Sequence, residues 1–95
     1  MGNYKLSEDA ENDLIRIHQY GFRKYGETQA EQYYLAFFEQ FERIAENPLL
    51  FQSVYHVREG YRRCVCGADS IYYRINGEMV EIIRILGQQN SKTVL

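Results

Sequence analysis

The sequence predicts an α+β fold in which an antiparallel helical hairpin packs on an antiparallel sheet of three or four strands. Three observations predict this class. Two stretches with helical periodicity come early, only three residues separate them, and an Asn-Gly turn between two β-branched and aromatic runs follows. The expected order is β-α-α-β-β-β, with the helices on one face of the sheet. The 95 residues are expected to form a single domain, 1–95, around one core.

The first elements are a short strand and a capped helix. Residues Asn3 to Leu6 alternate in polarity, and Ser7 stands at a helix N-cap position, with Glu8 and Asp9 in the favourable first turn. Small and apolar residues then recur at helical spacing, at Ala10, Leu14, Ile17 and Gly21. We expect this helix to run to about Lys24 and to stop at Tyr25-Gly26.

The second helix is expected to open with a capping box, Thr28-x-x-Glu31, and to end at Asn47-Pro48, because proline cannot continue a helix. One face of this helix is aromatic and apolar, with Ala30, Tyr34, Phe37, Phe38, Phe41, Ile44 and Ala45. Because the connection spans only Tyr25 to Glu27, the two helices must fold back antiparallel.

Three strand candidates follow: Tyr61 to Cys66 and the two arms of a hairpin. A type I′ turn with Asn76-Gly77 as its loop predicts these cross-strand pairs: Ile75 with Glu78, Tyr73 with Val80, Ile71 with Ile82, and Asp69 with Arg84 as an ion pair. This register assigns one face of the hairpin to the core, with Ile71, Tyr73, Ile75, Val80 and Ile82. It assigns the opposite face to Tyr72, Arg74, Met79, Glu81, Ile83 and Ile85.

That opposite face is too apolar to be left bare, so it is expected to bind a partner. The alternative is that the chain covers the face itself, with the loop from Leu49 to Val57 or the tail from Gln88 to Leu95.

Charge and cysteine usage exclude several classes of protein. The net charge is −2 and the pI is 5.6, which argues against gripping nucleic acid through phosphate neutralisation. No apolar run approaches the length of a membrane span, and the N-terminus has no signal-peptide core. Cys64 and Cys66 point to the same side of a strand, too far apart for a disulfide, and with His18 and His56 they give no metal-ligand spacing. We therefore expect a cytoplasmic protein with reduced thiols, no metal and no cofactor.

Several short motifs occur in a specific order. They are Leu6-Ser7-x-x-Ala10-x-x-Asp13-Leu14-x-x-Ile17, Gly26-x-x-Gln29-Ala30-x-x-Tyr33, Asn47-Pro48, Gly60-Tyr61-Arg62, Ile71-Tyr72-Tyr73-Arg74 and Ile82-x-Arg84-Ile85-Leu86. In this order and over nearly the whole chain, they resemble the ParE/RelE toxin superfamily of bacterial type II toxin–antitoxin modules, and the ParE branch in particular. The resemblance implies a toxin that poisons DNA gyrase and is neutralised by a cognate antitoxin, whose flexible C-terminal part wraps it.

The same resemblance leaves two other functions open. RelE-like relatives cut messenger RNA on the ribosome, and here Arg62, Arg63, Arg74 and Tyr72 would be the residues for that chemistry. Superfamily members often carry histidines where this chain has Asp69 and Gly87, and a tyrosine of ordinary pKa is a poor base at neutral pH. The third reading is a degenerate toxin that keeps only antitoxin binding. For a binding poison, the expected target- or antitoxin-binding residues are Tyr72, Arg74, Met79, Ile83, Arg84 and Ile85.

Overall fold

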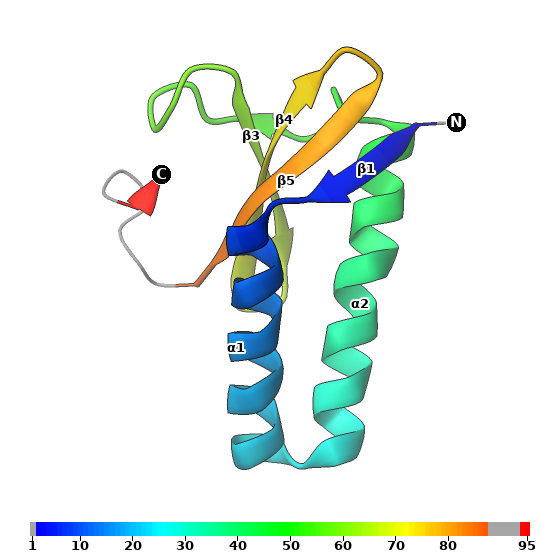
Figure 1. The fold of residues 1–95 in the computed structure, drawn as a ribbon, viewed down its shortest axis with the longest axis vertical. Coiled ribbons are helices and arrows are strands. Elements are labelled where there is room, and N and C mark those ends of the chain that lie inside the picture. The colour runs from blue at the N-terminus through cyan, green and yellow to red at the C-terminus, as the bar shows by residue number, and fades with distance from the viewer. Residues whose placement is uncertain (1, 88–93) are drawn as a thin grey trace.

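A computed structural model describes residues 2–87, 94 and 95, and it confirms the α+β class and the helical hairpin. The elements are β1 (Asn3–Leu6), α1 (Glu8–Tyr25), α2 (Glu27–Glu46), β2 (Gln52–Ser53), β3 (Tyr61–Cys66), β4 (Asp69–Asn76) and β5 (Met79–Leu86). Both helices cover one face of the sheet, and their ends nearest the α1–α2 connection extend beyond the strands (Figure 1). We call the other face of the sheet the outer face.

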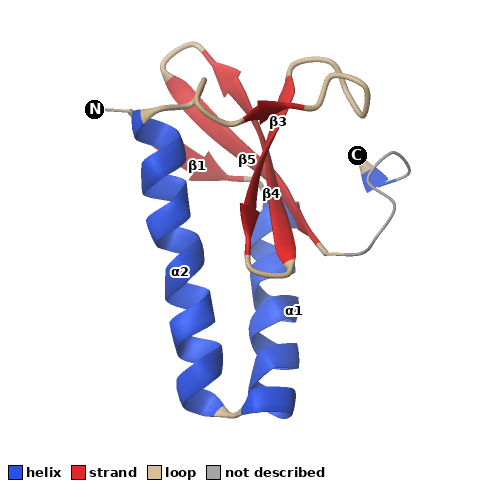
Figure 2. Ribbon diagram, turned by 180° about the vertical axis from the view of Figure 1, so that it is seen from behind, coloured by secondary structure: helices blue, strands red, loops and turns tan. Residues whose placement is uncertain are grey.

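The sheet has five strands in the order β1-β5-β4-β3-β2 and is mixed, whereas the sequence predicted three or four antiparallel strands. The antiparallel meander of β3, β4 and β5 leaves one edge of β5 open, and β1 pairs with that edge in parallel. The fifth strand, β2, has only two residues and pairs with β3 at the opposite edge. Figure 2 shows the strands lying together over the upper half of the two helices.

The first helix begins as predicted, at a Ser7 N-cap. The Ser7 hydroxyl accepts a hydrogen bond from the Ala10 N–H at 3.0 Å and donates one to the Ile83 carbonyl at 2.7 Å, which fixes the start of α1 against β5. The capping box predicted at Thr28 is wrong, because the N-cap of α2 is Gly26, two residues earlier, and the helix begins at Glu27. Gly26 has φ +93°, a backbone conformation that glycine adopts readily, and it is both the C-cap of α1 and the N-cap of α2.

The main core lies between the helices and the sheet. It combines the helix residues Ala10, Leu14, Ile17, Phe37, Phe41 and Ile44 with the strand residues Cys64, Cys66, Ile71, Tyr73, Val80, Ile82 and Ile85. Tyr73 is fully buried, and its hydroxyl donates a hydrogen bond to the Pro48 carbonyl at 2.6 Å. Both cysteines are buried free thiols, as predicted, and burial raises the pKa of Cys66 to about 11.

The β4–β5 hairpin has a different register from the predicted one. Asn76 pairs with Met79, Ile75 with Val80, and Tyr73 with Ile82, so the loop is Gly77-Glu78 and all four predicted pairs are wrong. Gly77 has φ +64°, and Glu78 does not have a positive φ, which is the pattern of a type II′ turn. Such a turn needs a glycine only at its first central position, so Asn76 can remain in the strand.

The register differs by two residues from the prediction, and a shift of two keeps each side chain on its predicted face near the turn. Ile71, Tyr73, Val80 and Ile82 are accordingly buried on the helix side. Beyond Tyr73 a β-bulge interrupts the pairing and reverses the alternation along β5. Ile85 is therefore fully buried in the core, and its assignment to the outer face is wrong.

Candidate functional site

The outer face carries a second, smaller apolar cluster. Its buried members are Val54, Tyr61, Tyr72 and Leu86, and Val57, Ile83 and Leu95 pack against them. The face is thus partly covered by the loop that follows β2 and by Leu95, whose carbonyl accepts a hydrogen bond from Arg58 at 2.7 Å. This confirms part of the self-covering alternative, although residues 88–93 of the predicted tail lie outside the described residues.

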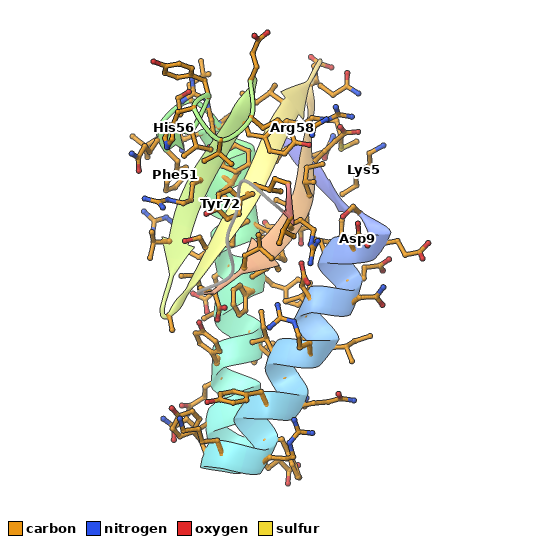
Figure 3. The ribbon with its side chains drawn as sticks, turned by 90° about the vertical axis from the view of Figure 1, so that its left-hand side faces the viewer. Lys5, Asp9, Phe51, His56, Arg58 and Tyr72 are labelled. Carbon is orange, nitrogen blue, oxygen red and sulfur yellow. The ribbon has the colours of Figure 1, made fainter. Side chains whose placement is uncertain are left out.

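Of the apolar residues predicted for the binding site, only two remain accessible. Tyr72 is 6% exposed beneath the loop and Ile85 is fully buried, whereas Met79 and Ile83 are half-buried on the outer side. Figure 3 shows Tyr72 over the middle of the sheet and Lys5 at the β1 edge. The accessible part of the predicted site therefore lies toward β1.

A ladder of charged side chains crosses β1, β5 and β4 in this accessible part. Glu81 is 8% exposed, and its carboxylate forms an ion pair with Lys5 Nζ at 3.3 Å on one side and accepts a hydrogen bond from Arg74 Nε on the other. Donation by Arg74 is the main cause that lowers the pKa of Glu81. Lys5, Leu6, Ser7, Arg74, Glu81 and Ile83 together line a hollow of about 320 Å³.

The other predicted arginine of the hairpin, Arg84, has a structural partner. The carboxylate of Asp13, which is 4% exposed, accepts from Arg84 Nε at 2.8 Å, from a terminal nitrogen of Arg84 at 3.0 Å and from the Ile85 N–H at 2.9 Å. The predicted Asp69–Arg84 ion pair does not form, because the observed register places Arg84 opposite Tyr72; Asp69 accepts a hydrogen bond from the Tyr33 hydroxyl at 2.8 Å. Asp13 therefore fastens α1 to β5 just past the bulge.

The residues predicted for ribonuclease chemistry do not meet at one point with a base. Arg62 donates to the Phe51 carbonyl at 2.7 Å and Arg63 to the Gln52 side chain at 3.1 Å, so both hold the loop and β2 against β3. Arg74 binds Glu81, and Tyr72 is buried in the outer cluster.

Neither histidine supplies the missing base. The His18 ring lies edge-on to Tyr34 within the helical hairpin, and His56 lies beside Tyr55 in the loop before β3. Among the tyrosines, burial raises the pKa of Tyr73 to about 12, which leaves even less of the basic phenolate form at neutral pH. Among the described residues, no cluster of side chains could hold a metal ion. Neither α1 nor α2 is long and apolar enough to cross a membrane.

Two residues of this region were missed from the sequence. Asp13 shares the buried helix face with Ala10, Leu14 and Ile17, and a carboxylate in such a stripe is a signal for a buried cationic partner. Lys5 carried no comparable signal, because its proximity to Glu81 depends on the non-local pairing of β1 with β5.

Comparisons with known proteins agree with this architecture. Residues 4–91 match the family described as ParE toxin of type II toxin-antitoxin system, parDE. Toxin ParE1 of Caulobacter vibrioides is 41% identical over 88 residues, which cover 93% of this chain and 91% of that protein. Toxin ParE1 of Mycobacterium tuberculosis is 32% identical over 87 residues, or 90% of this chain and 89% of that protein.

A solved structure gives the same fold. The chain superposes with a TM-score of 0.82 on one from the chromosomal ParDE TA system from P. aeruginosa, at 20% identity, covering 94% of this chain and 98% of that one. With the match of the family model over most of the chain, this chain belongs to the ParE toxin family of type II toxin–antitoxin systems.

Proposed function

We propose that the chain is a binding poison of DNA gyrase, acting through protein contacts without catalysis, and that a cognate antitoxin neutralises it. The single observation that carries the proposal is that the strand arginines hold separate protein oxygens and do not converge on one point with a base. Arg62 and Arg63 hold neighbouring backbone and side-chain oxygens, and Arg74 and Arg84 are paired with carboxylates. A ribonuclease needs cations directed at a phosphate together with a base and an acid.

The antitoxin half of the proposal is supported by exposed apolar surface. Five large side chains on the two helices are more than half exposed: Ile15, Tyr20, Phe22, Tyr25 and Leu35. Exposed apolar side chains of this number favour a partner that covers the hairpin, and a segment that orders on binding can cover a large surface. Such a partner also fits the toxin–antitoxin family to which the chain belongs.

Two assays run side by side test the proposed target. The purified chain is added to a gyrase supercoiling and DNA-cleavage assay and to a reconstituted translation assay. We expect gyrase to be inhibited and translation to continue. Translation arrest with gyrase untouched would assign the chain to the ribonuclease class, and failure in both assays would favour a degenerate toxin.

Charge reversal of Arg74 tests the outer face in the same setting. Arg74 is half exposed and lies at the surface, so we expect Arg74→Glu to fold and to reduce growth arrest on expression. Arg84→Glu is less informative, because it would place a second carboxylate against buried Asp13 and unfold the chain. Circular dichroism provides the folding control, and full toxicity from folded Arg74→Glu would remove Arg74 from the mechanism.

A further inference from the structure

The hollow on the outer face lies over β5, between β1 and β4. Its volume of about 320 Å³ suits a single side chain with accompanying water, and it is too small for a secondary-structure element. Lys5 comes from β1, Glu81 from β5 and Arg74 from β4, so the three charges stand in a row across adjacent strands. Ile83 gives the hollow an apolar wall beside those charges, whereas the Leu6 side chain packs toward the main core.

The cations in this row have unused binding capacity. Glu81 is buried, whereas the side chains of Lys5 and Arg74 are 61% and 50% exposed. Two positive charges against one negative charge leave an excess of one. Arg74 donates to Glu81 through Nε, and its two terminal nitrogens have no protein partner within the described part of the chain. The exposed ends of both cations can therefore bind a second carboxylate.

We propose that Lys5 and Arg74 form a receptor for one carboxylate side chain of an extended acidic segment of the antitoxin. The inference rests on the proposed function, because it names the chemistry by which that antitoxin is recognised. A carboxylate fits the charge excess, and an apolar neighbour in the same segment would contact Ile83. An extended segment presents its side chains singly, so it can insert one of them into a hollow of this size.

Phosphate recognition fits the hollow less well. The single excess positive charge of Lys5, Arg74 and Glu81 attracts a nucleic-acid backbone only weakly, and the chain as a whole is acidic. A single carboxylate adds only one negative charge, which matches the one excess positive charge of Lys5, Arg74 and Glu81.

Glu81 has a double role in this receptor. It holds the two cations on either side of the hollow, and it also competes with the incoming carboxylate for them. Replacing Glu81 with neutral glutamine removes the competitor while keeping the side-chain shape. The receptor therefore predicts opposite effects: loss of a cation weakens binding, and loss of the Glu81 charge strengthens it.

The test measures binding of the purified antitoxin encoded beside this chain, by titration calorimetry at several salt concentrations. We expect Lys5→Gln and Arg74→Gln each to weaken the affinity by about tenfold and to reduce its salt dependence. We expect Glu81→Gln to strengthen it by up to about fivefold. The matched control is Arg43→Gln, which removes one exposed cation in the last turn of α2, eight residues past the exposed Leu35, and should leave the affinity unchanged.

Four results would overturn the inference. Unchanged antitoxin affinity in folded Lys5→Gln and Arg74→Gln would overturn the inference and leave the proposed function intact. A weaker complex with Glu81→Gln would have the same consequence. Unchanged antitoxin affinity combined with lost gyrase inhibition would assign the hollow to the target. If the wild-type chain binds no antitoxin at all, the neutralisation half of the proposed function fails and the inference fails with it.

Discussion

Replacement of Asp13 by alanine should destabilise the fold more than any exposed substitution on the same helix. The side chain is 5% exposed and accepts from Arg84 Nε at 2.8 Å, from a second Arg84 nitrogen at 3.0 Å and from the Ile85 N–H at 2.9 Å. Alanine leaves the guanidinium without its carboxylate and leaves a buried backbone N–H without an acceptor.

The magnitude follows from these two losses. Breaking a buried ion pair by removing one partner costs about 3–5 kcal/mol, and the Arg84 side chain, at 23% exposure, regains some hydration and moves the cost to the lower end. The unsatisfied Ile85 N–H adds about 1 kcal/mol or more. The sum of about 4 kcal/mol is a large share of the roughly 5–15 kcal/mol that stabilises a typical domain.

Urea unfolding followed by circular dichroism measures this loss. We expect the midpoint for Asp13→Ala to fall by roughly 2 M, and the midpoint for Asp13→Asn to fall less, because the amide oxygen can still accept from Ile85. The control is Glu11→Ala, an exposed carboxylate of the same helix, whose cost should stay below about 1 kcal/mol. A loss under about 1 kcal/mol for Asp13→Ala would refute the claim that Asp13 fastens α1 to β5.

Two further predictions follow from the turns and from the charge ladder. Gly67→Ala should destabilise the chain clearly more than Gly77→Ala in urea unfolding. Both glycines have positive φ, at +61° and +64°, so both substitutions carry the same backbone strain. An added Cβ at Gly67 would lie 2.5 Å from the Tyr33 ring, whereas at Gly77 it would meet nothing within 4 Å. Equal losses would show that the Tyr33 ring yields freely. Removing the guanidinium in Arg74→Gln should raise the pKa of Glu81, which can be followed by a carboxyl NMR titration. The pKa of Glu81 is lower in the folded chain than in the unfolded chain, where it is about 4.3. The ionised Glu81 therefore stabilises the fold above about pH 4.3, and this stability is lost as the pH falls through the folded-state pKa. Arg74→Gln should weaken this dependence of stability on pH. An unchanged Glu81 pKa would contradict the pairing.

Local sequence patterns predicted the helical hairpin well. The Ser7 cap, the apolar periodicity and the Asn47-Pro48 stop each act through neighbouring residues, and the structure confirms both helices within a residue or so of the predicted ends. The N-cap of the second helix was missed by two residues, because Gly26 serves as the cap of both helices. The hairpin register was harder, because Gly77 can occupy a positive-φ position in a type I′ turn over Asn76-Gly77 or in a type II′ turn over Gly77-Glu78.

The features that the sequence did not predict depend on contacts between distant residues. The bulge in β5 turns Ile85 into the core, and it coincides with the bonds from Asp13, more than 70 positions earlier in the chain. The ladder that joins Lys5 to Glu81 requires β1 to pair with β5, and periodicity does not specify strand pairing across a sheet. The outer face was correctly identified as apolar, but its partial cover by Val57 and Leu95 was one of two open alternatives.

The stoichiometry of gyrase inhibition tests the central claim most directly. Supercoiling activity is measured at a fixed gyrase concentration while the purified chain is titrated from well below to well above that concentration. A poison that acts by binding should inhibit in proportion to the fraction of gyrase occupied, and an excess of antitoxin should reverse the inhibition. Complete loss of activity at amounts far below one chain per gyrase, increasing with time, would show catalytic turnover and contradict the account, and so would an absence of inhibition at any ratio.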